Sequence, residues 1–238
     1  MLAIPADTPL PAAWANKPWP DERPPIPGDV TRMVAGHRVH HWDGRDWLSV
    51  STVLGIMGWG NVSHVPPQAL EWGRVRGTLV DQMCRWLEMG VLDWDSVDPR
   101  LKPYVEAWQR FLDYYKIPLG MMEHEALIVN PSMGVFGYAD RRVTWDVYAG
   151  GATHKDDPHR TVRHIIDIKT SAHIGRAYRY QLAAYCADGE RPLVVQLQKT
   201  GKYVPHDFSE TVAADRARFA ILAEEAHLYL AEEGSRKK

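Results

Sequence analysis

Cysteine is scarce in this sequence. Only two are present among 238 residues, Cys84 and Cys186. Two thiols cannot supply the four ligands of an iron–sulfur cluster or of a Cys₄ zinc site, so both kinds of centre are excluded. Each cysteine falls in a predicted helix, and we expect both to be buried thiols of a reducing compartment.

Long apolar runs, a secretory leader and a strong net charge are also lacking. No run approaches the length that crosses a bilayer, and the N-terminus, Met-Leu-Ala-Ile-Pro, has neither the basic nor the long apolar region of a signal peptide. We therefore expect a cytoplasmic protein with no membrane partner. The net charge of −2 excludes a uniformly basic nucleic-acid-binding protein, but residues 141–204 hold 11 Lys/Arg against 6 Asp/Glu, so one face can be basic.

Proline is concentrated at one end of the chain. Residues 1–30 contain 8 of the 17 prolines, a composition that cannot form a regular helix or a central strand. We predict an extended Pro-rich arm over residues 1–36, followed by a single domain over 37–238. A domain of this length is large enough to bury a hydrophobic core.

The remaining sequence carries signals for both helices and strands. A hairpin over 37–48 turns at Asp43-Gly44, and a short helix capped by Ser or Thr follows it. A solvated loop is expected over 150–160. Further helices are expected over 66–88, 98–115, 175–187 and from 209 onward, and strands over 125–129, 134–145, 162–169, 193–197 and 203–208. This order predicts an α/β fold of the mixed α+β kind, with a central mixed β-sheet flanked by helices.

Two acids and a lysine stand on neighbouring predicted strands. Asp167 and Lys169 point to one face of their strand and Ile168 points into the core. Asp140 comes at the end of the preceding strand, after Gly137, which allows close approach of backbone or ligand. Carboxylates converging from adjacent strands suit a hard cation such as Mg²⁺ or Mn²⁺. A cross-strand ion pair without catalytic function would use the same residues.

The helix that follows carries polar side chains on one face. Gln181 and Tyr185 are four residues apart and share that face, and Arg176 and Arg179 lie at or near the helix start. A glutamine amide and a phenol can orient a water molecule or bind a phosphate. A polar pair that merely packs the helix on the sheet is the alternative.

These motifs resemble the PD-(D/E)XK nuclease superfamily, in its RecB-like and phage-exonuclease branch. The resemblance rests on three segments, Gly137-x-x-Asp140, Asp167-x-Lys169 and Gln181-x-x-x-Tyr185. Upstream, residues 49–54 are similar to the Ser-Val-Thr-x-Ile-Leu segment of these proteins, and residues 76–80 to their Arg-Gly-Thr-x-Val-His helix. The resemblance covers residues 38–205 and implies a restriction-endonuclease-like core.

The resemblance also implies roles for the site residues. Asp140 and Asp167 would bind Mg²⁺ or Mn²⁺ together with the backbone carbonyl of Ile168. Lys169 would position the attacking water or stabilise the transition state. Gln181 and Tyr185 would line the DNA-binding side, with three arginines as further substrate-binding residues: Arg76, Arg176 and Arg179.

The sequence departs from the family pattern at two positions. Asp81 stands where many relatives have a metal-ligating histidine; it could ligate Mg²⁺ or be an exposed helix residue. Ala139 replaces the proline of the superfamily's name, a common change in this branch. Glu125, on the preceding predicted strand, is a further candidate for an accessory acid.

The expected function is that of a metal-dependent deoxyribonuclease from a bacterium or a phage-infected cell. An exonuclease that processes DNA ends in recombination, replication or repair is the first subtype, and a structure-selective endonuclease the second. A non-catalytic DNA-binding module that keeps the nuclease fold is the alternative from another class. DNA is the expected partner; a single-strand annealing or single-strand-binding protein and a homo-oligomer are further candidates.

Overall fold

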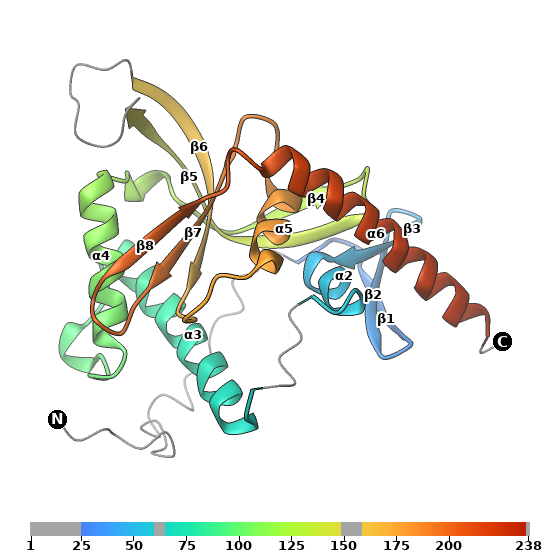
Figure 1. Cartoon of the computed structure of the whole chain (residues 1–238), viewed down its shortest axis with the longest axis horizontal. Helices are drawn as coiled ribbons and strands as arrows, with labels where there is room; N and C mark the ends of the chain where they lie inside the picture. Colours follow the sequence, from blue (N-terminus) through green and yellow to red (C-terminus); the bar gives the residue numbers. More distant parts are fainter. Residues whose placement is uncertain (1–24, 60–64, 149–158, 237–238) are drawn as a thin grey trace.

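The computed structural model describes residues 25–59, 65–148 and 159–236 (Figure 1). Most of the predicted Pro-rich arm and of the loop over 150–160 lies outside these residues. In the described part, a mixed β-sheet is flanked by helices, which confirms the predicted α/β class.

The sheet contains eight strands in the described residues and runs in the order β1-β2-β3-β5-β6-β7-β8, with β4 paired to β5. The pairs β3–β5 and β6–β7 are parallel and the others are antiparallel. The strand bounds are β1 (Val30–Val34), β2 (His37–Trp42), β3 (Arg45–Ser49), β4 (Glu123–Asn130), β5 (Val135–Tyr148), β6 (His159–Lys169), β7 (Arg191–Leu197) and β8 (Tyr203–Asp207).

The helices divide between two hydrophobic cores. Helices α3 and α4 share one core with residues of β5–β8, and α2, α5 and α6 share the other with residues of β2, β3 and β5–β7. Figure 1 shows α3 and α4 together on one side of the β5–β8 strands, and α6 running past α5 and α2. The helix bounds are α2 (Val50–Ile56), α3 (Pro67–Glu88), α4 (Lys102–Tyr115), α5 (Arg176–Tyr185) and α6 (Val212–Ser235), with short 3₁₀ turns at η1 (Trp94–Ser96) and η2 (Leu119–Met121).

Local signals set several of these elements where the sequence predicts them. Strands β2 and β3 turn at Asp43 and Gly44, whose positive φ values of 52° and 71° suit a tight hairpin. The hydroxyl of Ser49 accepts a hydrogen bond from the backbone N–H of Thr52 at 3.1 Å and so caps α2. Helix α3 begins at the expected proline.

Several boundaries differ from the prediction; among the strands, β5 extends to Tyr148 and β6 begins at His159. Residues 30–34, which the sequence places in the arm, form β1 and pair along their whole length with β2. Helix α4 begins at Lys102, because Asp98 and Pro99 form a preceding turn in which the Asp98 carbonyl accepts from Leu101 and Lys102. Helix α6 begins at Val212, three residues after the predicted Ser209.

Candidate active site

The two predicted acids lie opposite each other at the end of the β5–β6 ladder. The antiparallel register joins Arg141 to Ile166, so the next position of that register sets Asp140 against Asp167. The expectation that the two acids come from adjacent strands is therefore confirmed. The sequence suggested that Asp140 comes at the end of its strand. In the structure, Asp140 lies inside β5.

Strand β5 changes its neighbour at this point. On one edge it pairs with β4 over residues 135–142. On the other edge it pairs with β3 at residues 135–136 and with β6 at residues 141–148. Positions 137–140 of that edge lie between the two described ladders, so Asp140 stands where the sheet opens beside β6.

Lys169 is held against the acidic pair. Its Nζ donates a hydrogen bond to Oδ1 of Asp167 at 2.7 Å and lies at the same distance from Oδ2. Burial would lower the pKa of Lys169, but the carboxylates of Asp167 and Asp140 raise it above its ordinary value. The side chain is therefore an ammonium at neutral pH, able to neutralise negative charge on a substrate.

Asp167 is buried, Asp140 is partly buried, and the pair is suited to a cation. Asp167 is 3% exposed, and its Oδ2 contacts the Lys169 ammonium at 2.7 Å but makes no hydrogen bond to another group in the described part of the chain. Burial, and then repulsion from Asp167, raises the pKa of Asp140 well above its ordinary value. Oxygen-ligated Mg²⁺ or Mn²⁺ would offset both effects, so the donor set fits such an ion.

The fit rests on two carboxylates. Among the residues that the structure describes, no three His, Cys, Asp or Glu side chains form a group that could hold a metal ion. Ile168, whose backbone carbonyl is the predicted third ligand, lies between Asp167 and Lys169 with its side chain in the core.

Helix α5 places its polar face beside the acids. A Cβ added at Gly137 would overlap the ring of Tyr185, coming 2.7 Å from Cζ, so the ring needs a glycine beneath it. Burial, and then the charges of Asp140 and Asp167, raises the pKa of Tyr185, which keeps the phenol neutral. Gln181 lies one helical turn before Tyr185, close enough for its amide to lower the pKa of the phenol, so the two predicted residues of α5 lie together next to the acidic pair.

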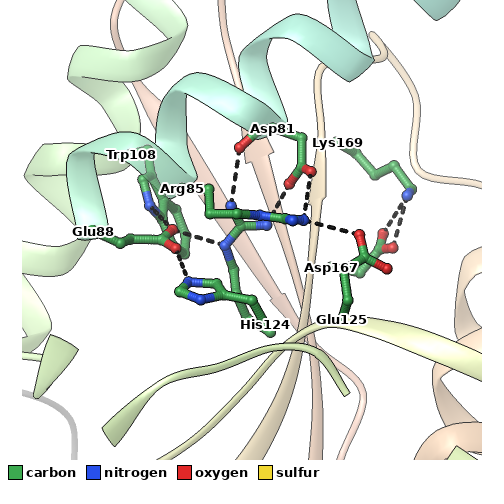
Figure 2. Close-up of polar contacts among 9 residues, drawn as sticks. Asp81, Arg85, Glu88, Trp108, His124, Glu125, Asp167 and Lys169 are labelled. Atoms are coloured by element: carbon green, nitrogen blue, oxygen red, sulfur yellow. Dashed lines mark hydrogen bonds and ion pairs between the residues drawn. The ribbon is translucent and has the colours of Figure 1, made fainter. Parts of the chain in front are cut away.

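Asp81 is engaged by arginines. Its carboxylate forms an ion pair with Arg141 and lies 3.5 Å from Nη2 of Arg85 (Figure 2). Burial would raise the pKa of Asp81, but the nearby charges of Arg141, Arg85 and Lys169 lower it. Asp81 is thus an ion-paired residue of α3. Neither of the two predicted alternatives, a metal ligand or an exposed side chain, describes these contacts. Metal ligation by Asp81 stays a prediction.

Glu125 occupies the position opposite Asp140 on the other neighbouring strand. The β4–β5 ladder pairs residue 124 with 141 and residue 126 with 139, but the pair between them is missing. Glu125 has a left-handed φ of 46°, which is uncommon for a residue other than glycine. Its Oε1 accepts a hydrogen bond from Arg85 at 2.9 Å. The backbone is therefore distorted where the acids face each other, as is common at functional sites.

A buried layer of charged side chains, which the sequence analysis missed, fixes α3 to β4 and β5 behind these acids. Arg141 is fully buried and donates from Nε to Glu88 at 2.7 Å. The Glu88 carboxylate also accepts from Nε1 of Trp108 at 2.6 Å and contacts Nε2 of His124 at 2.5 Å (Figure 2). Charged residues at 81, 85 and 88, spaced to share one face of a helix that must pack on a sheet, were the available signal.

The three predicted substrate-binding arginines have different surroundings. Arg76 donates to the Thr170 side chain and carbonyl. Arg179 forms a two-pronged ion pair with Asp215 of α6, with distances of 3.1 Å from Nε and 2.8 Å from Nη2. Arg176 is exposed at the first position of α5. Of the three, Arg176 is the one whose guanidinium makes no hydrogen bond or ion pair with another described residue.

Comparison with known proteins adds no relative: no protein-family model matches this chain, and no curated protein matches it. Within the described residues, no helix has both the length and the apolar character needed to cross a membrane.

Proposed function

We propose that the protein is a Mg²⁺-dependent deoxyribonuclease with a restriction-endonuclease-like core. The observation that carries this proposal is the convergence of Asp140, Asp167 and Lys169 where β5 changes its neighbour, with the Lys169 ammonium 2.7 Å from both carboxylate oxygens of Asp167. Two carboxylates and an ammonium at one point match the charge needs of phosphodiester hydrolysis.

Each residue has a separate task in this proposal. Asp140, Asp167 and the Ile168 carbonyl would hold Mg²⁺, which when bound lowers the pKa of water and offsets phosphate charge. The Lys169 ammonium stabilises negative charge that builds on the phosphate. The neutral phenol of Tyr185 donates a hydrogen bond toward a phosphate oxygen, and Gln181 orients that phenol.

Exonuclease action on DNA ends is the proposed subtype, on the resemblance to RecB-like and phage exonucleases. A structure-selective endonuclease would use the same residues. A non-catalytic DNA-binding module typically loses an acid or the lysine, and here Asp140, Asp167 and Lys169 are all present, which supports an enzyme.

The proposal is tested by incubating the protein with end-labelled linear and with circular DNA, in Mg²⁺, Mn²⁺ or a chelator. Asp140→Ala and Lys169→Ala are assayed beside the wild type. Asp146→Ala is the matched control, because Asp146 is an exposed acid of the same strand and its carboxylate accepts a hydrogen bond from Thr161 at 2.7 Å.

We expect metal-dependent digestion of linear DNA by the wild type and the control, and none by the two site variants. Cleavage of circular DNA would show that the enzyme is an endonuclease and not an exonuclease. A nuclease centre at these residues would be refuted if the wild type cleaved neither DNA nor RNA with either metal. It would also be refuted if Asp140→Ala were as active as the wild type.

A further inference from the structure

The segment that joins Lys169 to α5, residues 170–175, is held by α3 on one side. Arg76 donates from Nε to the Thr170 hydroxyl at 3.2 Å and from Nη2 to the Thr170 carbonyl at 3.1 Å. The same guanidinium lies 5.5 Å from the ring centroid of Tyr104, a buried residue of α4. Arg76 is thus fixed between α4 and the residue that directly follows the lysine.

On the other side the segment is held by β7. Gln196 is the register partner of Lys169 in the β6–β7 ladder and is 8% exposed. Beyond Lys169 the chain leaves the sheet, and the Gln196 amide takes over by donating from Nε2 to the carbonyls of Ser171 at 2.8 Å and Ala172 at 2.9 Å. Carbonyl oxygens only accept hydrogen bonds, so this contact requires the NH₂ group.

A further contact fixes the opposite end of the amide. Oε1 of Gln196 lies 3.2 Å from Nε2 of His206 in β8. An amide with partners at both ends cannot rotate without losing hydrogen bonds at a largely buried position, which is costly. The two carbonyls are therefore held at a defined place relative to the sheet.

Residues 170–175 place helix α5 beside the Lys169 ammonium. After Gly175 the chain enters α5, and the Tyr178 ring of that helix lies 5.0 Å from Nζ of Lys169. The ammonium is thus bounded by Asp167 on its own strand and by Tyr178 on the helix that the segment delivers. A shift of residues 170–175 would move both Tyr178 and the face of α5 that carries Gln181 and Tyr185.

We propose that Arg76 and Gln196 are positioning residues that act through residues 170–175 to set the Lys169 ammonium and helix α5 against the acidic pair. This inference rests on the proposed nuclease function. It gives Arg76 a role other than the substrate contact expected from the sequence, and it adds Gln196, which no sequence motif indicated. Small displacements of catalytic groups lower turnover strongly, by as much as about 100-fold for 1 Å.

The test separates positioning from DNA contact. Turnover, KM and DNA affinity are measured with linear DNA and Mg²⁺ for Arg76→Met, Arg76→Lys, Thr170→Val, Gln196→Leu and the double variant Arg76→Met/Thr170→Val. Arg74→Met is the matched control, because this α3 arginine is mostly exposed and pairs only with Glu71, at 3.2 Å, in the contacts described. Hydrogen–deuterium exchange of peptides covering residues 170–175 is measured on the same samples and needs no nuclease activity.

We expect Arg76→Met and Gln196→Leu to lower kcat by roughly 10- to 100-fold, with KM and DNA affinity within about twofold of wild type. Exchange over residues 170–175 should rise in both, and Arg76→Lys should recover part of the turnover. The double variant should be no slower than Arg76→Met, because the hydroxyl contact that Thr170→Val removes is already lost in Arg76→Met.

Three results would overturn the inference: an effect mainly on KM or DNA affinity, additive losses in the double variant, or unchanged exchange over residues 170–175. If the wild type cleaves nothing but the variants show the increase in exchange, the proposed function is refuted. The fixing of residues 170–175 by Arg76 and Gln196 is then still supported. A cleaving wild type with unchanged exchange in the variants would do the reverse.

Discussion

Replacing Gly137 by alanine would place a methyl group inside the space of the Tyr185 ring. The added Cβ would lie 2.7 Å from Cζ, and closer still to two other atoms of the side chain. Tyr185 is 8% exposed and belongs to the core shared by α5 and α6, so its ring cannot turn into solvent without leaving that core. Gly137 is not among the positive-φ glycines, so the cost comes from the collision alone.

Overpacking of this kind destabilises a core by about 1–3 kcal/mol, and we expect Gly137→Ala to lower the free energy of unfolding in urea by that amount. Gly73→Ala is the control. Gly73 lies inside α3 with nothing within 4 Å of an added Cβ, so alanine there should stabilise the protein by up to about 1 kcal/mol.

A double-mutant cycle identifies the colliding group. In a Tyr185→Leu background the ring is absent, so Gly137→Ala should cost at least about 1 kcal/mol less than in the wild type. A loss below about 0.5 kcal/mol in the wild-type background, or strict additivity with Tyr185→Leu, would show that Tyr185 does not lie over Gly137. The placement of the α5 polar face beside the acidic pair would then be wrong as well.

Two further predictions concern buried titratable groups. Glu88→Gln removes one of the two carboxylates that pair with fully buried Arg141 and leaves Asp81 as the other. We therefore expect urea denaturation to show about 1.5–3 kcal/mol lower stability; a loss under about 1 kcal/mol would contradict the buried layer. Burial lowers the pKa of His164 to about 4 from 6.5, so the unfolded chain takes up the proton first and stability falls as pH drops from about 6.5 to 4, by roughly 3 kcal/mol. His164→Phe, which keeps an aromatic ring against Trp145, should flatten that part of the stability–pH curve, and an unchanged curve would exclude His164 as its source.

Much of the fold follows from local sequence signals. The β2–β3 hairpin depends on the turn at Asp43-Gly44, and α2 depends on the Ser49 cap. Both signals act over a few residues, so the sequence places them well. Strand β1 was not predicted, because its residues directly follow a proline-rich stretch. Its strand conformation depends on pairing with β2, which becomes clear only in the folded sheet.

The candidate site divides in the same way. Adjacent strands with Asp140 and Asp167 could be predicted, since alternation and turn residues mark each strand. The partners of Asp81 and Arg179 could not, because Arg141 is 60 residues and Asp215 36 residues away in sequence. Ion pairs over such separations depend on how helices pack, which no short motif reports.

Gln196 shows a third limit. It stands in an apolar strand sequence, where a single amide carries no sign of its partners. Its positioning role can be inferred only from the folded structure, in which the chain beyond Lys169 leaves the sheet and two of its carbonyls accept hydrogen bonds from the Gln196 amide.

The most direct test of the central claim is the rate of Mg²⁺-dependent DNA hydrolysis by Asp140→Asn, which keeps the size of the side chain and removes its charge. We expect the wild type to hydrolyse linear DNA and Asp140→Asn to be slower by at least about 1,000-fold, while urea denaturation shows that the variant is still folded. Hydrolysis by Asp140→Asn at the wild-type rate would contradict a catalytic metal site at Asp140.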